Sequence, residues 1–444
     1  MTKVKISIIG AGSAVFSMRL VRDICLTPSL QESTVCFMDI NKDRLHVVQT
    51  LARRYAQESQ ADLKLVSTTD RAQALRDADF VINTALIGGH HDVEQERLVE
   101  EAHGYYRGMR LGSYFHQLKF MLEVTQNMED LCPTAWLIQA SNPVFDGCTL
   151  MNRESNLNVL GLCHGHYGVY KIAHILELDR AAIAFQAPGV NHCIWMNEFR
   201  YHGRDAYPIL DNWITTRAEE YWKSWDGSPM EVQMSPAAVS LYKMFGLFPI
   251  GDTPRFAGAW WHHVDLTTKK KWFNKYGGFD SEMGWQYYLT RLERRMKTMQ
   301  RLAQSPSQTL STEFPLELSG EQHIPIIDAL TNDHEGSFQV NVMNHGAVPG
   351  FGEDLVVEVP GVVNGGGVKA IKVQRFPKVL IHHIHRTQII PMELGLEAFT
   401  TGNLSVLTNK VLADHRTQSY EQAQNVIDAV FALPFNTDLQ VHFS

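Results

Sequence analysis

The sequence predicts an α/β protein, with a doubly wound parallel sheet at the N-terminus followed by a mixed α+β second domain. Short β-branched runs alternate with helical apolar spacing as far as about residue 162, a pattern typical of parallel strands joined by helices. After about residue 195 tryptophan and tyrosine become frequent and the helices lengthen. At 444 residues the chain also exceeds the usual size of one hydrophobic core. We therefore expect one domain over residues 1–194 and a second over 195–444.

The elements of the first domain follow in order along the chain. A strand is expected over residues 4–9, where it ends in a glycine-rich turn, and residues 14–26 then have helical spacing. In the second domain, residues 338–363 form a β-like segment broken by glycine and proline. Ligands collect outside the carboxyl ends of parallel strands, so polar residues that directly follow a strand are candidates for function. Further strands are expected over 34–38, 63–67, 80–85, 135–140 and 159–162, and further helices up to about 59, over 70–78 and over about 118–131.

Composition places the chain among ordinary soluble globular proteins. It is 44% apolar and 20% charged, with a formal net charge of −8, and without a basic block it is not expected to bind nucleic acid. No apolar run reaches the roughly 18 residues of a membrane span. The first residues also lack a signal-peptide pattern, so we expect a cytoplasmic protein. The six cysteines show no paired spacing, which favours free thiols over disulfides.

The turn after the first strand resembles a dinucleotide-binding loop, which makes the first domain Rossmann-like. Its glycines allow backbone amides to approach a pyrophosphate closely. Asp39 follows Gly12 by 27 residues at the end of the second strand, where it can accept hydrogen bonds from ribose hydroxyls, which favours NAD over NADP. Val15 stands where a third glycine is usual, so a plain strand–helix turn stays open, with Asp39 as a cap. The residues expected to bind the cofactor are Gly10, Gly12, Ser13, Ala14, Val15, Phe16, Asp39 and Asn83.

A cysteine and a histidine further along the chain are candidate metal ligands. Cys163 begins the motif Cys163-His164-Gly165-His166 directly after a predicted strand, and His192 ends Gly189-Val190-Asn191-His192. A thiolate and an imidazole suit a divalent metal, and Asn142 in Ser141-Asn142-Pro143 follows a neighbouring strand. The two ligands lie 29 residues apart, so a shared site depends on the fold bringing two loops together. A buried cysteine and a hydrogen-bonded core histidine are the alternative.

These motifs make the chain similar to glycoside hydrolase family 4 over nearly its whole length. The resemblance is closest to the α-glucosidase branch, which carries Cys-His-Gly-His where the phosphoglucosidases carry Cys-Asp or Cys-Asn. It implies an enzyme that binds NAD and a divalent metal, usually Mn²⁺, and that forms a homodimer or homotetramer. It also implies cleavage by oxidation at C3, proton removal at C2, elimination, water addition and re-reduction. Further matching segments are Met38-Asp39-Ile40, Pro249-Ile250-Gly251-Asp252-Thr253, Arg255, Lys269-Lys270-Lys271-Trp272-Phe273 and Ser319-Gly320-Glu321-Gln322-His323-Ile324-Pro325.

The resemblance also implies roles for single residues. Cys163 and His192 would hold the metal, which would act as a Lewis acid on the C2 and C3 oxygens. Asp252 matches the proton-abstracting base of that branch, and His164 matches its general acid. Asn142 and Arg255 would contact the sugar, and residues 195–444 would bind substrate and form the oligomer interface. From the residues alone, Asp252 also fits a turn carboxylate, His164 a residue that orients its loop, and Arg255 a solvated loop end.

The expected substrate is a small unphosphorylated α-glucoside such as maltose, but other activities stay open. Between Gly108 and His116 the chain is shorter than similar family members, and it lacks an aspartate that contacts sugar in them. An α-glucuronidase is the alternative within the family, and Arg107, Arg110 and Arg255 are candidates to bind its C6 carboxylate. Two other classes stay open. An NAD-dependent 2-hydroxy-acid dehydrogenase would produce net NADH without a metal. A non-catalytic nucleotide sensor would bind the nucleotide and catalyse no reaction.

Two histidine-containing segments have both a functional and a structural interpretation. Trp260-Trp261-His262-His263-Val264-Asp265 could form a sugar-stacking or metal-rich wall, but aromatic clusters more often pack into cores. The segment His382-His383-Ile384-His385 resembles a metal tract. No carboxylate or cysteine accompanies it locally, so we expect an ordinary helix or strand there.

Overall fold

The computed structural model describes residues 2–13, 16–225, 228–374 and 376–443. Six parallel strands form one half of its large sheet, in the order β6-β5-β4-β1-β2-β3. This is the order of a doubly wound dinucleotide-binding sheet, and the predicted fold class is confirmed. The order reverses between β1 and β4, so the crevice outside their carboxyl ends is the expected ligand site. These strands are β1 (Lys5–Ile9), β2 (Thr34–Met38), β3 (Lys64–Thr68), β4 (Phe80–Asn83), β5 (Trp136–Gln139) and β6 (Asn158–Gly161).

The sheet continues beyond β6 with antiparallel strands. β13 (Gly336–Met343) pairs with β6 through Asn341 and Gly161, and β14 (Val356–Asn364) pairs with β13 along its whole length. Strands of the large sheet thus come from both sides of residue 194, and a domain division there stays a prediction. The other strands of this half are β8 (Gly189–Val190), β9 (Cys193–Met196), β12 (Phe248–Ile250) and β15 (Gly367–Ala370), and a small separate sheet holds β7 (Ile183–Gln186), β10 (Glu198–Tyr201) and β11 (Arg204–Asp205).

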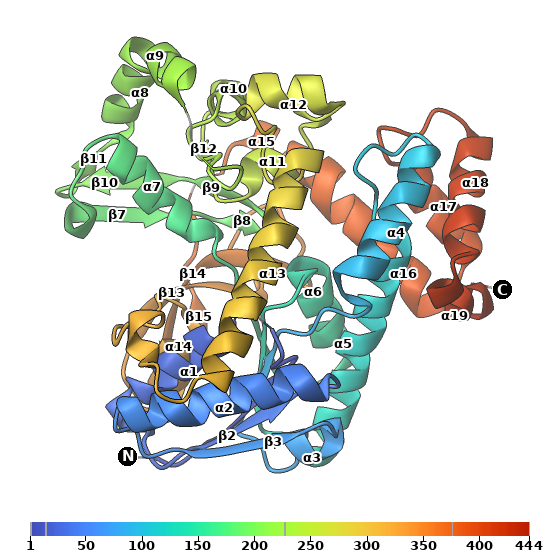
Figure 1. The fold of residues 1–444 in the computed structure, drawn as a ribbon. Coiled ribbons are helices and arrows are strands. Elements are labelled where there is room, and N and C mark those ends of the chain that lie inside the picture. The colour runs from blue at the N-terminus through green and yellow to red at the C-terminus, as the bar shows by residue number, and fades with distance from the viewer. Residues whose placement is uncertain (1, 14–15, 226–227, 375, 444) are drawn as a thin grey trace.

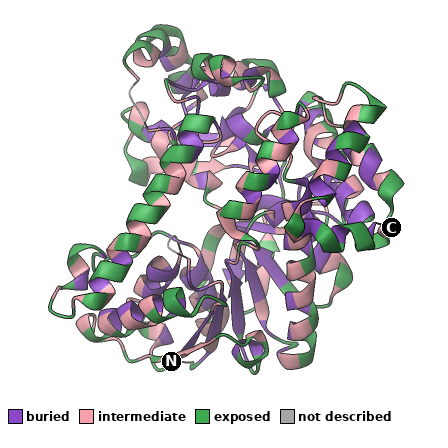
Figure 2. Ribbon diagram, turned by 45° about the vertical axis from the view of Figure 1, so that its right-hand side comes forward, coloured by how far each residue is buried: buried purple, intermediate pink, exposed green. Residues whose placement is uncertain are grey.

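Helices cover both faces of the parallel strands, which are buried in Figure 2. Side chains alternate between the faces of a strand, so Ile6 and Ile8 of β1 pack into one core while Ile9 packs into another. Both cores are apolar, which explains why the strands are continuous β-branched runs rather than alternating ones. The first face is covered by α1 (Ser17–Cys25), α2 (Lys42–Glu58), α13 (Glu282–Gln304) and α14 (His323–Asn332), and the second by α3 (Arg71–Leu75), α5 (Leu111–Leu131) and α6 (Val144–Glu154).

Helix α5 begins at Leu111 rather than near residue 118. Its first turn is stabilised by two buried glutamates, because Glu100 accepts the Leu111 amide at 2.8 Å and Glu96 accepts the amides of Gly112 and Ser113 at 2.6 and 2.8 Å. These carboxylates satisfy backbone donors that a helix start leaves without partners. The capping groups come from the preceding helix, so local spacing gave no sign of the earlier start.

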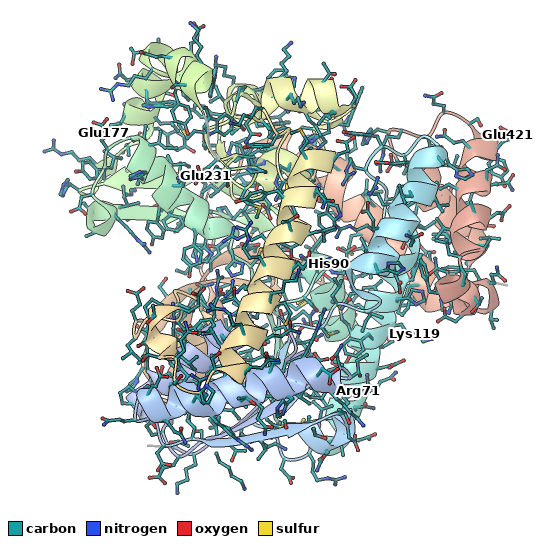
Figure 3. All side chains as sticks on the ribbon, viewed as in Figure 1. Arg71, His90, Lys119, Glu177, Glu231 and Glu421 are labelled. Atoms are coloured by element: carbon teal, nitrogen blue, oxygen red, sulfur yellow. The ribbon has the colours of Figure 1, made fainter. Side chains whose placement is uncertain are left out.

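The long helix α13 connects the parallel sheet with the rest of the molecule. It runs across the front of the structure from α2 toward the helices at the top of Figure 1. Its last turn places Leu302 in the sheet core. Near its first turn, Trp285 contacts His90 of α4 (Gly89–Ala102) at 5.5 Å between ring centroids, and Figure 3 shows His90 between the two helices. Helices α4 and α13 therefore contact each other through these two side chains.

The remaining helices lie at the upper left, the top and the right of the view in Figure 1. Within the C-terminal group, residues His385–Ile389 form a π-helical turn between α15 and α16. Pro391 follows that turn in the next helix, and a proline removes one backbone donor, which explains a local widening. No helix in the described ranges is long and apolar enough to cross a membrane. These helices are α7 (Gly168–Ile175), α8 (Tyr207–Thr216), α9 (Ala218–Ser224), α10 (Pro236–Phe245), α11 (Thr253–Phe256), α12 (Leu266–Trp272), α15 (Lys378–Ile384), α16 (Ile390–Thr401), α17 (Leu404–Leu412), α18 (Tyr420–Phe431) and α19 (Thr437–His442).

Candidate active site

The turn after β1 has the close packing expected of a dinucleotide loop. Gly10 has a φ of +80°, and a Cβ there would lie 2.6 Å from the Cα atom of Ala85, which follows β4. The Gly12 amide donates to Oδ2 of Asp39 at 2.7 Å, and Oδ1 of Asp39 accepts the Asn41 amide at 2.8 Å. A Cβ on Gly12 would lie 2.7 Å from the same Oδ2 atom. Only glycine fits both positions at the reversal point of the sheet.

The other residues predicted to bind the cofactor lie around this turn. Ser13 is half-buried, and Phe16 stacks on His164 with ring centroids 5.8 Å apart. Asn83 is fully buried at the end of β4, where it donates to Gln139 at 2.9 Å and accepts the Ala85 amide at 3.2 Å. Ala14 and Val15 fall outside the described residues. The roles of all these residues toward a cofactor stay predictions, and Asn83 already has protein partners.

Cys163 and His192 come to one place in the structure. Cys163 lies just after β6, and His192 lies in the turn between β8 and β9 with a φ of +63°, a backbone conformation that is uncommon outside glycine. The side chain of Asn191, next to His192, lowers the pKa of the Cys163 thiol, and its Nδ2 atom donates to Glu358 at 3.0 Å. The negative charges of Asp252 and Glu358 act on both side chains and raise the pKa of the thiol and of the imidazole. The fold therefore joins the two loops on which the predicted metal site depends.

The chemistry of this donor set fits a divalent cation. Burial raises the pKa of the Cys163 thiol to about 11, and Glu358 adds to that effect. Burial lowers the pKa of His192 and leaves a neutral imidazole, the form that binds metals. A cation would offset the carboxylates and stabilise the thiolate. Within the described residues no cluster of three or more His, Cys, Asp or Glu side chains is arranged to hold a metal, so these two ligands would leave positions open for substrate and water.

Asp252 faces His192 and is fixed by Arg255. Its Oδ2 atom lies 3.7 Å from Nε2 of His192, and its Oδ1 atom is ion-paired with Arg255. Burial alone would raise the pKa of Asp252, but the positive charge of Arg255 holds it below the usual value. The carboxylate is therefore ionised near neutral pH, and 37% of the side chain remains exposed. Arg255 is only 5% exposed, so it is not the solvated loop end that its sequence also allowed.

A second carboxylate, Asp280, holds Arg255 from the other side. It lies 3.6 Å from Nη1 of Arg255 and accepts from Nζ of Lys269 at 2.8 Å. Although burial opposes ionisation, the charges of Lys269 and Arg255 keep the pKa of Asp280 well below its usual range. Asp252 is thus held in place by a series of ion pairs, in which Arg255 contacts Asp280 and Asp280 contacts Lys269. Asp280 is not identifiable from the sequence alone, because Gly277-Gly278-Phe279-Asp280 carries only turn signals.

His164 is paired with a buried glutamate. Its Nε2 atom lies 2.7 Å from Oε2 of Glu321, whose Oε1 atom accepts from Arg19 of α1 at 2.8 Å. Burial would lower the pKa of His164, but the contact with Glu321 raises it above the usual value. That contact also overcomes the effect of burial on Glu321 and lowers its pKa to about 2. The raised pKa favours the protonated imidazole, and 46% of the His164 side chain is exposed, which suits a proton donor.

Asn142 and Glu358 complete the surroundings. β5 and β6 pair in parallel, so the exposed Asn142 and Cys163 follow neighbouring strands at one edge of the sheet. Glu358 is 1% exposed in β14, where burial raises its pKa and Gln339 donates to it at 3.5 Å. The sequence pattern around Glu358 does indicate a buried carboxylate. A lone charge within Leu355-Val356-Val357-Glu358-Val359 is expected to be buried and to have a partner.

A cavity of about 830 Å³ adjoins this group and is rich in positive charge. Arg255 and Phe256 line it, and Phe256 stacks on His192 at 5.2 Å between ring centroids. The Arg110 guanidinium lies 6.0 Å from the Trp285 ring and takes part in no ion pair among the described residues. The cavity lining has six arginines and two lysines against three carboxylates, namely Arg97, Arg107, Arg110, Arg255, Arg386, Arg416, Lys269 and Lys410 against Glu94, Asp280 and Asp414.

The two histidine-containing segments have different surroundings. His262 is fully buried and packs on Trp272, whereas Trp260 and His263 line the cavity. Neither interpretation of that segment therefore holds for all of it. The segment from His382 belongs to the end of α15 and the following π-helical turn, as expected of a helical segment. All six cysteines are free thiols.

Comparison with known proteins gives a consistent result. The chain matches the models of "Family 4 glycosyl hydrolase" over residues 5–178 and "Family 4 glycosyl hydrolase C-terminal domain" over residues 187–417. An α-glucosidase of Erwinia rhapontici is 24% identical over 96% of this chain and 97% of its own length. An α-galacturonidase of Thermoanaerobacter italicus is 23% identical over 96% of each chain. These relatives favour a glycosidase over a 2-hydroxy-acid dehydrogenase.

A solved structure has the same fold. A 6-phospho-α-glucosidase from gut microorganisms, determined in complex with NAD and Mn²⁺, superimposes with a TM-score of 0.79. The superposition covers 97% of this chain and 98% of the other, at 18% sequence identity. The fold is thus shared along the whole chain.

Proposed function

The chain belongs to family 4 of the glycosyl hydrolases, and on that premise we propose an NAD- and Mn²⁺-dependent α-glycosidase that acts on small unphosphorylated α-glucosides. The observation that supports it best is that Cys163, His192 and Asp252 lie together beside the dinucleotide loop. The site adjoins the loop because His164, next to Cys163, stacks on Phe16. We further propose that the protein acts as a homodimer or homotetramer, which light scattering of the purified protein checks.

The cofactor would bind across the reversal point of the sheet. Backbone amides of the loop around Gly10 and Gly12 would meet the pyrophosphate, and Asp39 would accept the ribose hydroxyls. Ile40, next to Asp39, is 85% exposed and offers an apolar surface to the adenine. NAD, when bound, supplies a hydride acceptor for the sugar C3 and returns the hydride later, so it is not consumed.

Cys163 and His192 would hold Mn²⁺, which when bound supplies Lewis-acid polarisation of the sugar C2 and C3 oxygens. Asp252 then removes the C2 proton, which C3 oxidation has made acidic. Its ionised carboxylate is ready for this step, and Arg255 keeps it in place. His164 donates a proton to the departing C1 oxygen, and Glu321 raises the pKa of that imidazole. Water adds to the resulting double bond, and re-reduction at C3 completes hydrolysis.

Gly12→Ala is expected to weaken NAD binding by roughly tenfold or more, because the added Cβ displaces the Asp39 carboxylate and charged hydrogen bonds are worth ~1.5–3 kcal/mol. The added Cβ atom would lie 2.7 Å from Oδ2 of Asp39. Titration of the protein with NADH, followed by fluorescence, measures the Kd. Gly366→Ala at an exposed loop tip is the matched control, and equal Kd values for the two variants would contradict this account of the loop.

Glu321→Gln is expected to shift the pH dependence of kcat. Glu321 raises the pKa of His164, so without its charge the imidazole loses its proton at lower pH. The alkaline limb should therefore move to lower pH by about 1 unit, a typical effect of removing one nearby opposite charge. A kcat profile between pH 5 and 9, on the scale suited to histidine, measures the shift. A uniform fall in kcat with an unmoved limb would assign Glu321 a purely structural role.

A specific observation supports an acidic sugar as a second candidate substrate. The three arginines named as candidates for a C6 carboxylate, Arg107, Arg110 and Arg255, all line the cavity. Arg107 lies 3.7 Å from a carboxylate oxygen of Glu101 and donates to the Asp280 carbonyl at 2.8 Å, and Arg255 is paired with two carboxylates. Arg110 alone among them has no carboxylate partner in the described structure, so its charge is available to a ligand.

The test is hydrolysis of paired nitrophenyl α-glucoside, α-glucuronide and α-galacturonide, with NAD, Mn²⁺ and a thiol reductant each omitted in turn. The proposal predicts sugar release that needs NAD and Mn²⁺ and leaves NADH absorbance unchanged after turnover. Faster cleavage of a uronide than of the glucoside selects the second candidate. Hydrolysis that is indifferent to NAD, or net NADH production without sugar release, would refute both.

A further inference from the structure

The cavity extends well beyond the residues assigned to the reaction. Its volume of about 830 Å³ lies in the upper part of the roughly 300–1,000 Å³ range of small-molecule sites, which leaves room for more than one pyranose ring. Arg255 and Phe256 lie at the end next to Asp252 and His192. Trp260, Arg386 and His415 line the same cavity from elements that no part of the proposed reaction uses.

Trp260 has the properties of a sugar platform. It is 43% exposed, unlike a core tryptophan, and its ring stacks on His415 with centroids 5.4 Å apart and planes inclined by 20°. The histidine supports the indole, which loses little freedom when a ligand ring packs against it. Tryptophan presents a broad apolar face with a polar edge, and such a face suits the C–H groups of a pyranose.

The loop that carries Trp260 is fixed to the π-helical turn His385–Ile389. Gln388 donates to the Phe256 carbonyl at 2.7 Å, and Thr387 donates to the Ala257 carbonyl at 3.4 Å. Gly258 has a φ of +71°, and a Cβ there would lie 2.4 Å from Cβ of Thr387. π-helical turns are frequent at functional sites, and this one holds the segment between Arg255 and Trp260 by these contacts.

The same turn presents an unpaired cation to the cavity. Arg386 is exposed, and in the part of the chain that the structure describes its guanidinium makes no ion pair or hydrogen bond. Arg416, by contrast, is neutralised by Asp414 through contacts of 2.9 and 2.7 Å. Arginine is suited to bind a carboxylate with two hydrogen bonds.

We propose that Trp260, His415 and Arg386 form a leaving-group subsite, which binds a second pyranose ring that carries a carboxylate. The ring would pack on Trp260 and the carboxylate would face Arg386, while the scissile bond lies toward Asp252. The proposal rests on the proposed glycosidase function and adds the class of its leaving group, an acidic sugar. Acidic disaccharides would then be better substrates than glycosides of small alcohols.

The experiment compares three substrates that share one glycone, the one preferred in the nitrophenyl assay. Their leaving groups are methanol, a neutral pyranose and a uronic acid. Trp260→Ala is expected to raise KM about tenfold for both sugar leaving groups, the size of a lost aromatic contact, and to leave the methyl glycoside within about twofold. Arg386→Gln should raise KM only for the uronic acid. Tyr420→Ala and Arg204→Gln, exposed residues away from the cavity, are the controls.

A second measurement separates this proposal from the proposed function. Calorimetric titration of the NAD-loaded protein with free glucuronic acid and free glucose does not depend on turnover. The subsite predicts tighter binding of the acid, lost in Arg386→Gln, even if no glycoside is cleaved. Equal KM changes for all three substrates in Trp260→Ala, or equal binding of the two free sugars, would overturn the subsite and leave the glycosidase assignment intact.

Discussion

Cys163→Ser is expected to reduce kcat by at least about 10³-fold while NAD binding stays unchanged. A hydroxyl is a poor substitute for a thiolate on a divalent metal, and loss of Lewis-acid stabilisation worth several kcal/mol corresponds to three or more orders of magnitude in rate. His192 alone, next to Asn191, would bind Mn²⁺ only weakly. The dinucleotide loop lies on other strands, so its affinity for NADH should not change.

The measurement pairs activity with Mn²⁺ binding followed by electron paramagnetic resonance. Cys25→Ala, which removes a buried thiol from α1 far from the site, is the control for loss of a cysteine, and Tm values of both variants check the fold. The account predicts a large rise in the Mn²⁺ Kd for Cys163→Ser only. Wild-type activity of Cys163→Ser with added Mn²⁺ would remove Cys163 from the metal site.

Asp252→Asn is expected to reduce kcat by about 10³-fold, within the 10²–10⁴-fold range of general base catalysis, and to stop the reaction after oxidation. An amide cannot accept the C2 proton, whereas the C3 oxidation does not need it. The variant should therefore form NADH in an amount equal to the enzyme before any sugar is released, and release sugar only at the reduced rate. Arg255 would keep Asp280 as a partner, so the surrounding side chains should remain in place.

Stopped-flow absorbance of NADH, compared with released sugar, measures this effect. Asp130→Asn, on the exposed side of α5, is the matched control and should behave as wild type. If Asp252→Asn neither accumulates NADH nor slows hydrolysis, another residue is the base, and the turn-carboxylate interpretation of Asp252 is correct.

The sequence was sufficient for the parallel half of the fold, because its strands are short, mostly apolar runs separated by turn residues and by segments with helical spacing. β1 and β2 end just before Gly10 and Asp39, as predicted, and the positive φ and close packing at Gly10 require a glycine there. The antiparallel extension through β13 and β14 was not predictable in the same way. Its pairing with β6 is made by residues far apart in the chain, and no local period specifies the partner of a strand.

The residues of the candidate site likewise fall into those that local motifs identify and those that depend on contacts between distant segments. Motif residues such as Cys163 and His192 were identifiable because their residue types carry chemistry. No role was predicted for Glu321 or Asp280, because they act by contacts with His164 and Arg255 that only the fold creates. Their effect is electrostatic, through the charge states of the groups they touch. Trp260 was expected to be core, and its exposure on the cavity follows from the Gly258 turn against Thr387.

The most direct test of the oxidation and elimination proposed for this site is wild-type hydrolysis in D₂O, with NAD and Mn²⁺ present. Proton removal at C2 followed by re-protonation from solvent predicts deuterium at C2 of the released sugar in every turnover, with hydrogen retained at C3. Released sugar that carries hydrogen at C2 would show that the bond is broken by displacement, and would contradict the roles proposed for Asp252, Cys163 and His192 together.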